Sequence, residues 1–115
     1  MKFLSLLILF FSLKASACWN LTAEVTLNNE KLHIDQKFEH GRTYSFPKGI
    51  YIVHLRVPND FQVSGVSFKV KEKKSTQLIE LANEAIKLKN DKANVTLNNI
   101  KAHFVTNIEL KLTDI

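Results

Sequence analysis

The amino-acid sequence predicts a single all-β domain, built as a small antiparallel β-sandwich or a small barrel. Apolar and polar residues alternate over most of the chain, which is the period of a strand with one buried face. The alternating runs are short, and Asn, Gly and Pro residues typical of turns separate them. A chain of about six to eight short strands with few helix signals packs most economically as a sandwich or a barrel.

Residues 1–17 are predicted to be a secretory signal peptide and therefore to lie outside the folded domain. Lys2 gives a positively charged start, residues 3–13 (FLSLLILFFSL) form an apolar run, and residues 15–17 (ASA) are small enough for a signal peptidase. The apolar run is shorter than the roughly 20 residues that a helix needs to cross a bilayer. We therefore expect an exported protein, periplasmic or extracellular, whose residues 18–115 form one domain.

Cys18 is the only cysteine in the chain and would become the first residue after cleavage. In plain secretion its thiol stays free and is available for pairing with another molecule, because a single cysteine has no internal partner. Alternatively, the preceding ASA loosely resembles the small-residue motif of bacterial lipoproteins. A lipid on Cys18 would then be the only link to a membrane.

The pentapeptide VTLNN occurs twice, at residues 25–29 and 95–99, within AEVTLNNEKLHI and ANVTLNNIKAHF. Each stretch is predicted to be an amphipathic hairpin with a two-residue Asn-Asn turn, because asparagine accepts positive φ better than most residues. An internal duplication and the restricted composition of hairpins both account for such a repeat.

The Asn-Asn turns fix the register of both predicted hairpins. In the first hairpin Glu24 then lies opposite His33, and in the second hairpin Leu97 lies opposite Ile100 and Asn94 opposite His103. Each hairpin would present one apolar and one polar face.

Residues 41–57 are predicted to form two strands joined by a turn at residues 47–49. After residues 58–60 stop the second strand, Phe61 and Val63 are apolar at odd numbers, whereas the following strand is apolar at even numbers. Gly65 lies at this change and suggests a β-bulge or a break.

The stretch at residues 75–90 is ambiguous between helix and strand. Its Leu, Glu, Ala and Lys content favours one short helix around residues 76–89. Its resumed alternation favours two strands with a turn near residues 82–84. Residues 104–112 alternate throughout and are predicted to form one long final strand.

The sequence YSFPKGIYIVHLRVPNDFQVSGVSFKVKEKKSTQLIEL, residues 44–81, resembles the middle of the carboxypeptidase regulatory-like, or transthyretin-like, β-sandwich modules. The matching positions are Pro47, Gly49, Tyr51, Val53, Leu55 and residues 76–81. The chain departs from the family at its start, where WNLTAEVTLNNEKL replaces a glycine-rich opening strand. The resemblance implies an accessory, scaffolding or binding domain with no catalytic residues to carry over.

Nucleic acid is not an expected partner. Removing Lys2 and Lys14 with residues 1–17 lowers the number of Lys and Arg from 16 to 14 against 11 acidic residues, so the formal charge falls from +5 to +3. Binding nucleic acid would need a dense basic face beside aromatic groups that stack on bases. Acidic residues interrupt the basic ones here.

No metal, cofactor or catalytic site is expected either. Four histidines are scattered without a second cysteine or a ligand spacing: His33, His40, His54 and His103. The segment VSGVS at residues 63–67 lacks the first glycine of a nucleophile elbow. Glu24 and His33 are either an acid/base pair or, more ordinarily, a surface ion pair. Asn20 and Asn94 lie in glycosylation sequons, which matter only in a eukaryotic source.

The leading functional expectation is an exported, non-catalytic module that binds a protein or a glycan. The candidate contact residues are Trp19 and three apolar residues expected on outer faces: Ile50, Ile52 and Val105. One alternative is a structural or assembly subunit that oligomerises through edge strands, with the strand ending at Leu112 as the pairing site. A hydrolytic enzyme or an enzyme inhibitor is the other alternative.

Overall fold

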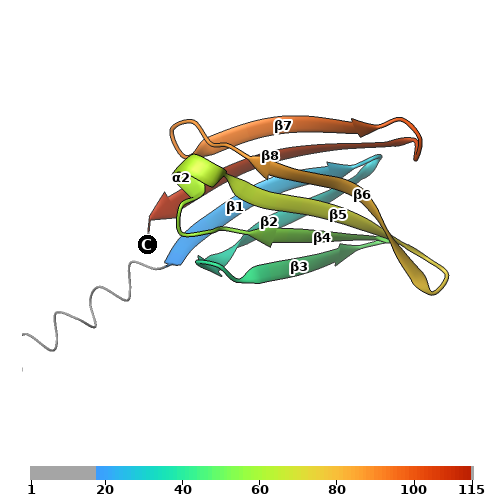
Figure 1. Ribbon diagram of the computed structural model, residues 1–115, viewed down its shortest axis with the longest axis horizontal. Coiled ribbons are helices and arrows are strands. Elements are labelled where there is room, and N and C mark those ends of the chain that lie inside the picture. The colour runs from blue at the N-terminus through green and yellow to red at the C-terminus, as the bar shows by residue number, and fades with distance from the viewer. Residues whose placement is uncertain (1–17, 115) are drawn as a thin grey trace, which may run out of the picture.

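The computed structural model describes residues 18–114, which form two four-stranded antiparallel sheets (Figure 1). Sheet A has the strand order β2-β1-β8-β7 and sheet B the order β3-β4-β5-β6. The strands are β1 (Cys18–Leu27), β2 (Glu30–Glu39), β3 (Thr43–Lys48), β4 (Tyr51–Arg56), β5 (Val66–Lys74), β6 (Gln77–Ile86), β7 (Lys92–Asn99) and β8 (Phe104–Asp114). A single helical turn, α2 (Phe61–Ser64), lies between β4 and β5. The all-β sandwich prediction is confirmed.

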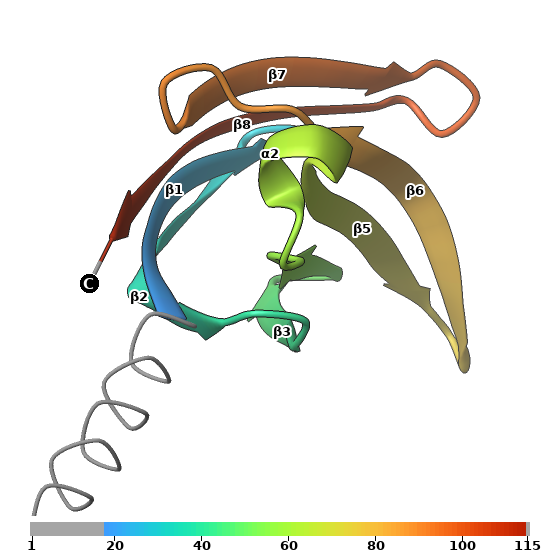
Figure 2. The ribbon, with the colours of Figure 1, turned by 60° about the vertical axis from the view of Figure 1, so that its left-hand side comes forward.

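The strands follow one another around the molecule in chain order, and β8 returns to pair with β1. Among residues 18–114 no strand ladder joins β2 to β3 or β6 to β7, so two separate sheets result. One side-chain hydrogen bond spans the second gap, where Asn99 Nδ2 donates to the Leu81 carbonyl oxygen at 3.0 Å. Figure 2 shows the strands surrounding the core, with α2 across one end.

The core lies between the sheets and takes alternate residues from both. In β1 and β8 the inward residues are as the alternation predicts, with Val25 and Ile108 fully buried. Sheet B contributes Val53, Leu55, Phe68 and Val70, among others. Tyr51 of β4 and Phe104 of β8 contact across the interior, with ring centroids 5.2 Å apart.

The predicted first hairpin is confirmed in every pair. Leu27 pairs with Glu30 and Glu24 pairs with His33, and Asn28 has the positive φ of 54° that a two-residue turn needs. The second hairpin was predicted wrongly, because its turn is a four-residue loop at residues 100–103 and Leu97 pairs with Thr106.

The register of the second hairpin follows from the third strand of the ladder. With an Asn-Asn turn Val95 would face Ala102, whereas in the structure it faces Ile108. Ile108 also pairs with Val25 of β1. The larger residue buries more apolar surface, and the pairing with β1 fixes where β8 lies. His103 therefore lies in the loop with a φ of 52°, and not opposite Asn94.

The two VTLNN copies lie on either side of β8 in the same register. Val25 and Val95 both pair with Ile108, and Thr26 and Thr96 both pair with Asn107. The repeat thus supplies two equivalent flanking strands to one central strand, β8.

The chain between β4 and β5 contains a helical turn at Phe61–Ser64, so the change from odd to even apolar positions comes from this turn and not from a bulge within a strand. Phe61 is buried and Val63 points to solvent. Gly65 marks the expected break. It has a φ of 89° and a ψ of 174°, and a Cβ at this position would lie 2.7 Å from the Ile86 carbonyl oxygen.

The helix predicted around residues 76–89 does not form, and neither does the turn near residues 82–84. Residues 77–86 are one continuous strand, and Val70 pairs with Ala82 while Lys71 pairs with Glu80. Leu81 is therefore an extra residue in a β-bulge, and it is buried. The bulge changes which residues face inward, which explains why the alternation looked broken.

Replacing Leu110 with alanine should lower the free energy of unfolding by about 2–5 kcal/mol, because it leaves a cavity under β8. Leu110 is 3% exposed. The neighbouring Lys111 points outward, so Lys111→Ala is the control and should change stability by only about 0.5 kcal/mol. Urea denaturation of both variants provides the measurement. Equal losses would show that β8 does not have this orientation.

Candidate functional site

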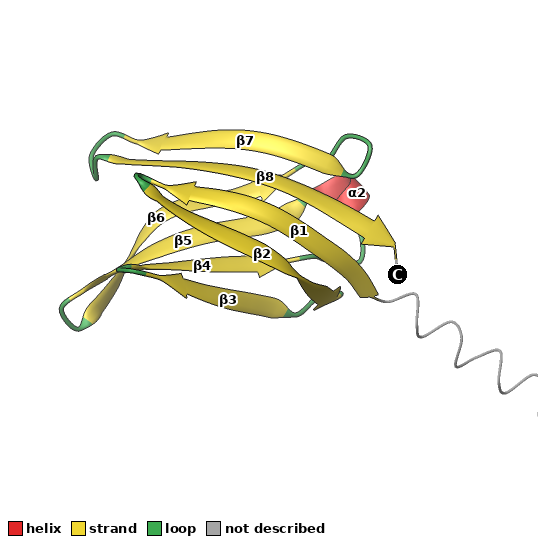
Figure 3. Cartoon of the chain, turned by 180° about the vertical axis from the view of Figure 1, so that it is seen from behind, coloured by secondary structure: helices red, strands yellow, loops and turns green. Residues whose placement is uncertain are grey.

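The end of the sandwich opposite α2 carries all four hairpin turns of residues 18–114, and we call it the turn end (Figure 3). The turns lie at residues 28–29, 49–50, 75–76 and 100–103. Strands that run up and down in chain order place alternate connections at the same end. The turn end is therefore a direct consequence of the meander.

Most of the exposed large apolar side chains lie at the turn end, spread over its turns. Five of the six in the described chain belong to these turns or to the strand residues beside them: Ile50, Leu78, Ile79, Ile100 and Val105. Ile100 is the most exposed of the five, at 78%. The sixth, Val63, lies in α2 at the opposite end. The turn end is therefore the part of the described chain that is richest in exposed aliphatic side chains.

The backbone around these side chains is held by hydrogen bonds. Lys73 N–H donates to the Ile50 carbonyl oxygen at 2.8 Å, which ties β5 to the turn between β3 and β4. Val105 N–H donates to Asn28 Oδ1 at 2.8 Å, which ties β8 to the turn between β1 and β2. The apolar side chains of these two segments are thus presented from fixed positions.

Two hollows open between the turns. One, of about 440 Å³, is lined by Leu27, Asn28, Asn29, Glu30, Gly49, Ile50 and Tyr51. The other, of about 360 Å³, lies between β6 and the loop that follows β7 and includes Ile100 and Phe104 in its lining. Both hollows place polar amide groups beside apolar side chains.

The four contact residues predicted from the sequence do not lie together. Ile50 and Val105 are at the turn end, and Ile52 is half-buried on the outer face of sheet B. Trp19 is half-buried near α2, where its ring meets Phe61 edge-on at 5.0 Å. Sequence reasoning missed Leu78, Ile79 and Ile100. The last pair between β4 and β5 is Tyr51 with Glu72. Leu78 of β6 pairs with Lys73, one residue further along β5, where β4 has already ended. The exposure of Leu78 therefore depends on the length of a different strand.

Cys18 begins β1 and has a free, half-buried thiol. It lies at the end of the molecule away from the turn end. Its predicted lipidation or pairing with another molecule remains a prediction, because residues 1–17 lie outside the described part of the chain.

Glu24 and His33, the pair considered for acid/base chemistry, lie together on sheet A, and His54 lies on the other sheet. His33 Nδ1 lies 2.8 Å from Glu24 Oε1, and both side chains are more than half exposed on the outer face of sheet A. His54 lies on β4, on the outer face of sheet B. Glu24 and His33 therefore form a surface ion pair, and no pocket brings His54 to them.

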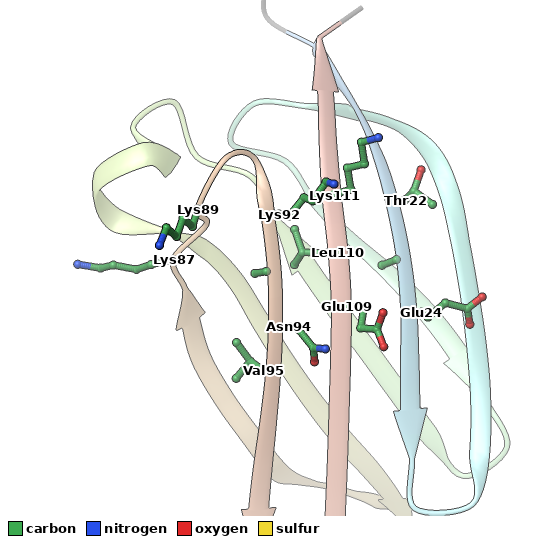
Figure 4. Close-up of a pocket in the computed structure, with 12 residues that line it drawn as sticks. Thr22, Glu24, Lys87, Lys89, Lys92, Asn94, Val95, Glu109, Leu110 and Lys111 are labelled. Atoms are coloured by element: carbon green, nitrogen blue, oxygen red, sulfur yellow. The ribbon is translucent and has the colours of Figure 1, made fainter.

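Another hollow, of about 640 Å³, lies over β1, β8, β7 and the connection between β6 and β7 (Figure 4). Four lysines are in its lining: Lys87, Lys89, Lys92 and Lys111. Glu24 and Glu109 are also there, and they pair directly across β1 and β8. The lysines lie toward one end of this surface and the two glutamates further along it, so its charge is not of a single sign.

His54 has a specific environment on the outer face of sheet B. Its Nδ1 lies 2.7 Å from Ser45 Oγ, and its Nε2 is buried with no partner among residues 18–114. Burial lowers the pKa of His54 below the usual 6.5, and the positive charges of Lys71 and Lys69 lower that pKa further.

Residues 18–114 contain no group of three or more His, Cys, Asp or Glu side chains that could hold a metal ion. No helix in this part of the chain is long and apolar enough to cross a membrane.

Comparison of the chain with known protein families, with characterised proteins and with solved structures finds no significant match. The resemblance to transthyretin-like modules therefore remains a prediction.

His54 should make the protein less stable in mild acid. Its pKa is lowered on folding, so between that lowered value and 6.5 the unfolded chain binds more protons than the folded chain. Stability therefore falls as the pH drops through this range. Arg56 of β4 and Lys69 and Lys71 of β5 are the charges around the ring, with Ser45 of β3 beside it.

The measurement is chemical denaturation of wild type and His54→Gln at pH 7 and pH 5, in chloride buffer. Glutamine does not titrate, so the stability of the variant relative to wild type should rise at the lower pH. A stability difference that stays constant between the two pH values would contradict the lowered pKa.

Proposed function

We propose that this chain is a small exported module that acts without catalysis and binds a partner protein through its turn end. The observation that carries the proposal is that five of the six exposed large aliphatic side chains of the described residues lie at one end of the sandwich, two of them on segments tied by hydrogen bonds. Contact surfaces of proteins combine such an apolar centre with polar surroundings. The resemblance of residues 44–81 to accessory and binding modules supports the same direction.

A protein partner fits the turn end better than a glycan. The exposed apolar residues there are Ile, Leu and Val, and none of the large exposed hydrophobic residues in the described chain is aromatic. Flat aromatic rings are the side chains that stack against sugar rings, whereas branched aliphatic side chains fill pockets in another protein.

Assembly through an edge strand is a second candidate, and one observation favours it. β7 is the edge of sheet A and carries the second VTLNN copy, whereas the first copy in β1 accepts β2 on its other side. A strand similar to β2 from another molecule would extend sheet A at β7. The sequence predicted the strand that ends at Leu112, β8, for this role. That prediction was wrong, because β8 lies inside sheet A and pairs with a strand on each side.

Two variants test the turn end against a matched control. Leu78→Asp and Ile100→Asp place charges among its apolar side chains, and Val63→Asp places one charge on α2 at the other end. All three positions are at least half exposed, so each variant should fold. We expect the first two to weaken binding at least about tenfold, because a desolvated carboxylate opposes an apolar contact.

Binding is measured first as capture of proteins from an envelope extract of the source organism and then with the purified captured protein. Capture that depends on Leu78 and Ile100 and not on Val63 supports the proposal. Equal capture by all three variants contradicts it. The alternative is tested by light scattering. If the mass of the wild-type protein increases with its concentration, and a charged residue at Val95 or Leu97 of β7 abolishes this increase, assembly through the edge strand replaces the proposed function.

A further inference from the structure

A basic hollow lies on the outer face of sheet B, away from the turn end, and its function does not depend on the proposal above. It has a volume of about 200 Å³ and is lined by Thr43, His54, Leu55, Arg56, Ser67, Lys69 and Lys71. Adjacent strands place these residues in rows. Thr43, Arg56 and Ser67 are direct neighbours across β3, β4 and β5, and His54 pairs with Lys69 in the next row.

The charge of this hollow is all of one sign. Arg56, Lys69 and Lys71 are cationic, and no carboxylate is among the lining residues. Glu80 of β6 lies beside the lining, because it is the cross-strand partner of Lys71 and its Oε1 lies 3.9 Å from Lys69 Nζ. Like charges on neighbouring strands repel, so the arrangement is more stable with an anion between them.

The donors are partly fixed before any ligand arrives. Arg56 Nε donates to the Gly41 carbonyl oxygen at 3.1 Å, which holds the guanidinium group in place and leaves its terminal nitrogens available. Thr43 and Ser67 add hydroxyl groups on the same row. A planar guanidinium group with ammonium and hydroxyl donors is the combination that binds oxyanions well.

His54 is the residue in the lining of this hollow whose ring can gain a proton near neutral pH. Its Nδ1 is occupied by Ser45 Oγ at 2.7 Å, and its buried Nε2 has no partner among the described residues. The protonated ring donates from both nitrogens and therefore needs an acceptor at Nε2. The nearby cations oppose that protonation, and an anion in the hollow would favour it.

We infer that this hollow is a binding site for a tetrahedral oxyanion, a sulfate or phosphate group that is either free or part of a larger molecule. Three cations beside the one carboxylate of Glu80 leave two positive charges in excess, which match a doubly charged group better than a singly charged carboxylate. The hydroxyl groups of Thr43 and Ser67 supply hydrogen bonds to oxygens that the cations do not reach.

The experiment is an NMR titration of the purified protein with sodium sulfate, and separately with phosphate, against sodium chloride at equal ionic strength. Sulfate should shift the His54 ring signals to saturation and raise the pKa of His54. The ring signals of His33, on the outer face of sheet A, should respond equally to sulfate and chloride. Identical effects of the two salts on His54 would overturn the inference.

Variants locate the site. Lys71→Gln and the double variant Arg56→Gln with Lys71→Gln should weaken sulfate binding, the double variant about tenfold or more, because each removes a charged hydrogen-bond donor. Lys37→Gln on β2 removes the same charge from sheet A and should leave binding unchanged. Unchanged sulfate binding in the double variant would show screening by the whole protein and overturn the site.

A sulfated disaccharide distinguishes the two sources of the group. Tighter binding of the disaccharide than of free sulfate, lost in the double variant, indicates a group carried by a larger molecule. Equal binding, lost in the same variant, indicates the free ion.

Discussion

The pairing of β8 with a strand on each side is the constraint on which the rest of the sandwich depends. β1 and β7 contact it through the same sequence in the same register, so three inward residues of β8, Thr106, Ile108 and Leu110, are each flanked by the same residue type on both sides. Thr106 is the one polar residue buried in the described core, and its hydroxyl donates to the Thr26 carbonyl oxygen at 2.7 Å. A buried hydroxyl without that acceptor would be destabilising, so this bond also selects the register.

Because β8 makes the long-range pairing with β1, sheet B needs only pairings between strands that are neighbours in the sequence. β3 to β6 are joined in sequence by short turns and a helical turn, and none of them pairs with a distant part of the chain. Their outer faces and turns are therefore free to vary in chemistry without changing the fold. The basic hollow and most of the exposed aliphatic residues are found on these strands and turns.

The features that depend on neighbouring residues were predicted correctly from the sequence. The features that depend on pairing with a strand far along the chain were not. The first hairpin depends only on Asn28 and Asn29 and on its own alternation, so its register was predictable. The second hairpin has the same local signal, but β1 fixes where β8 lies and its turn is longer. In β6 a single extra residue, Leu81, hides the strand period. The candidate surfaces were harder, because exposure of Leu78 depends on where β4 ends.

The three surfaces of the molecule differ in the kind of contact that they favour. The turn end offers aliphatic side chains on fixed turns, the outer face of sheet A mixes lysines with carboxylates, and the outer face of sheet B gathers cations around His54. An apolar contact is insensitive to salt, whereas an anion held by Arg56 and Lys71 is weakened by screening. One framework therefore holds two surfaces whose ligands would respond to different conditions, because the turns at one end and the outer face of sheet B carry different side chains.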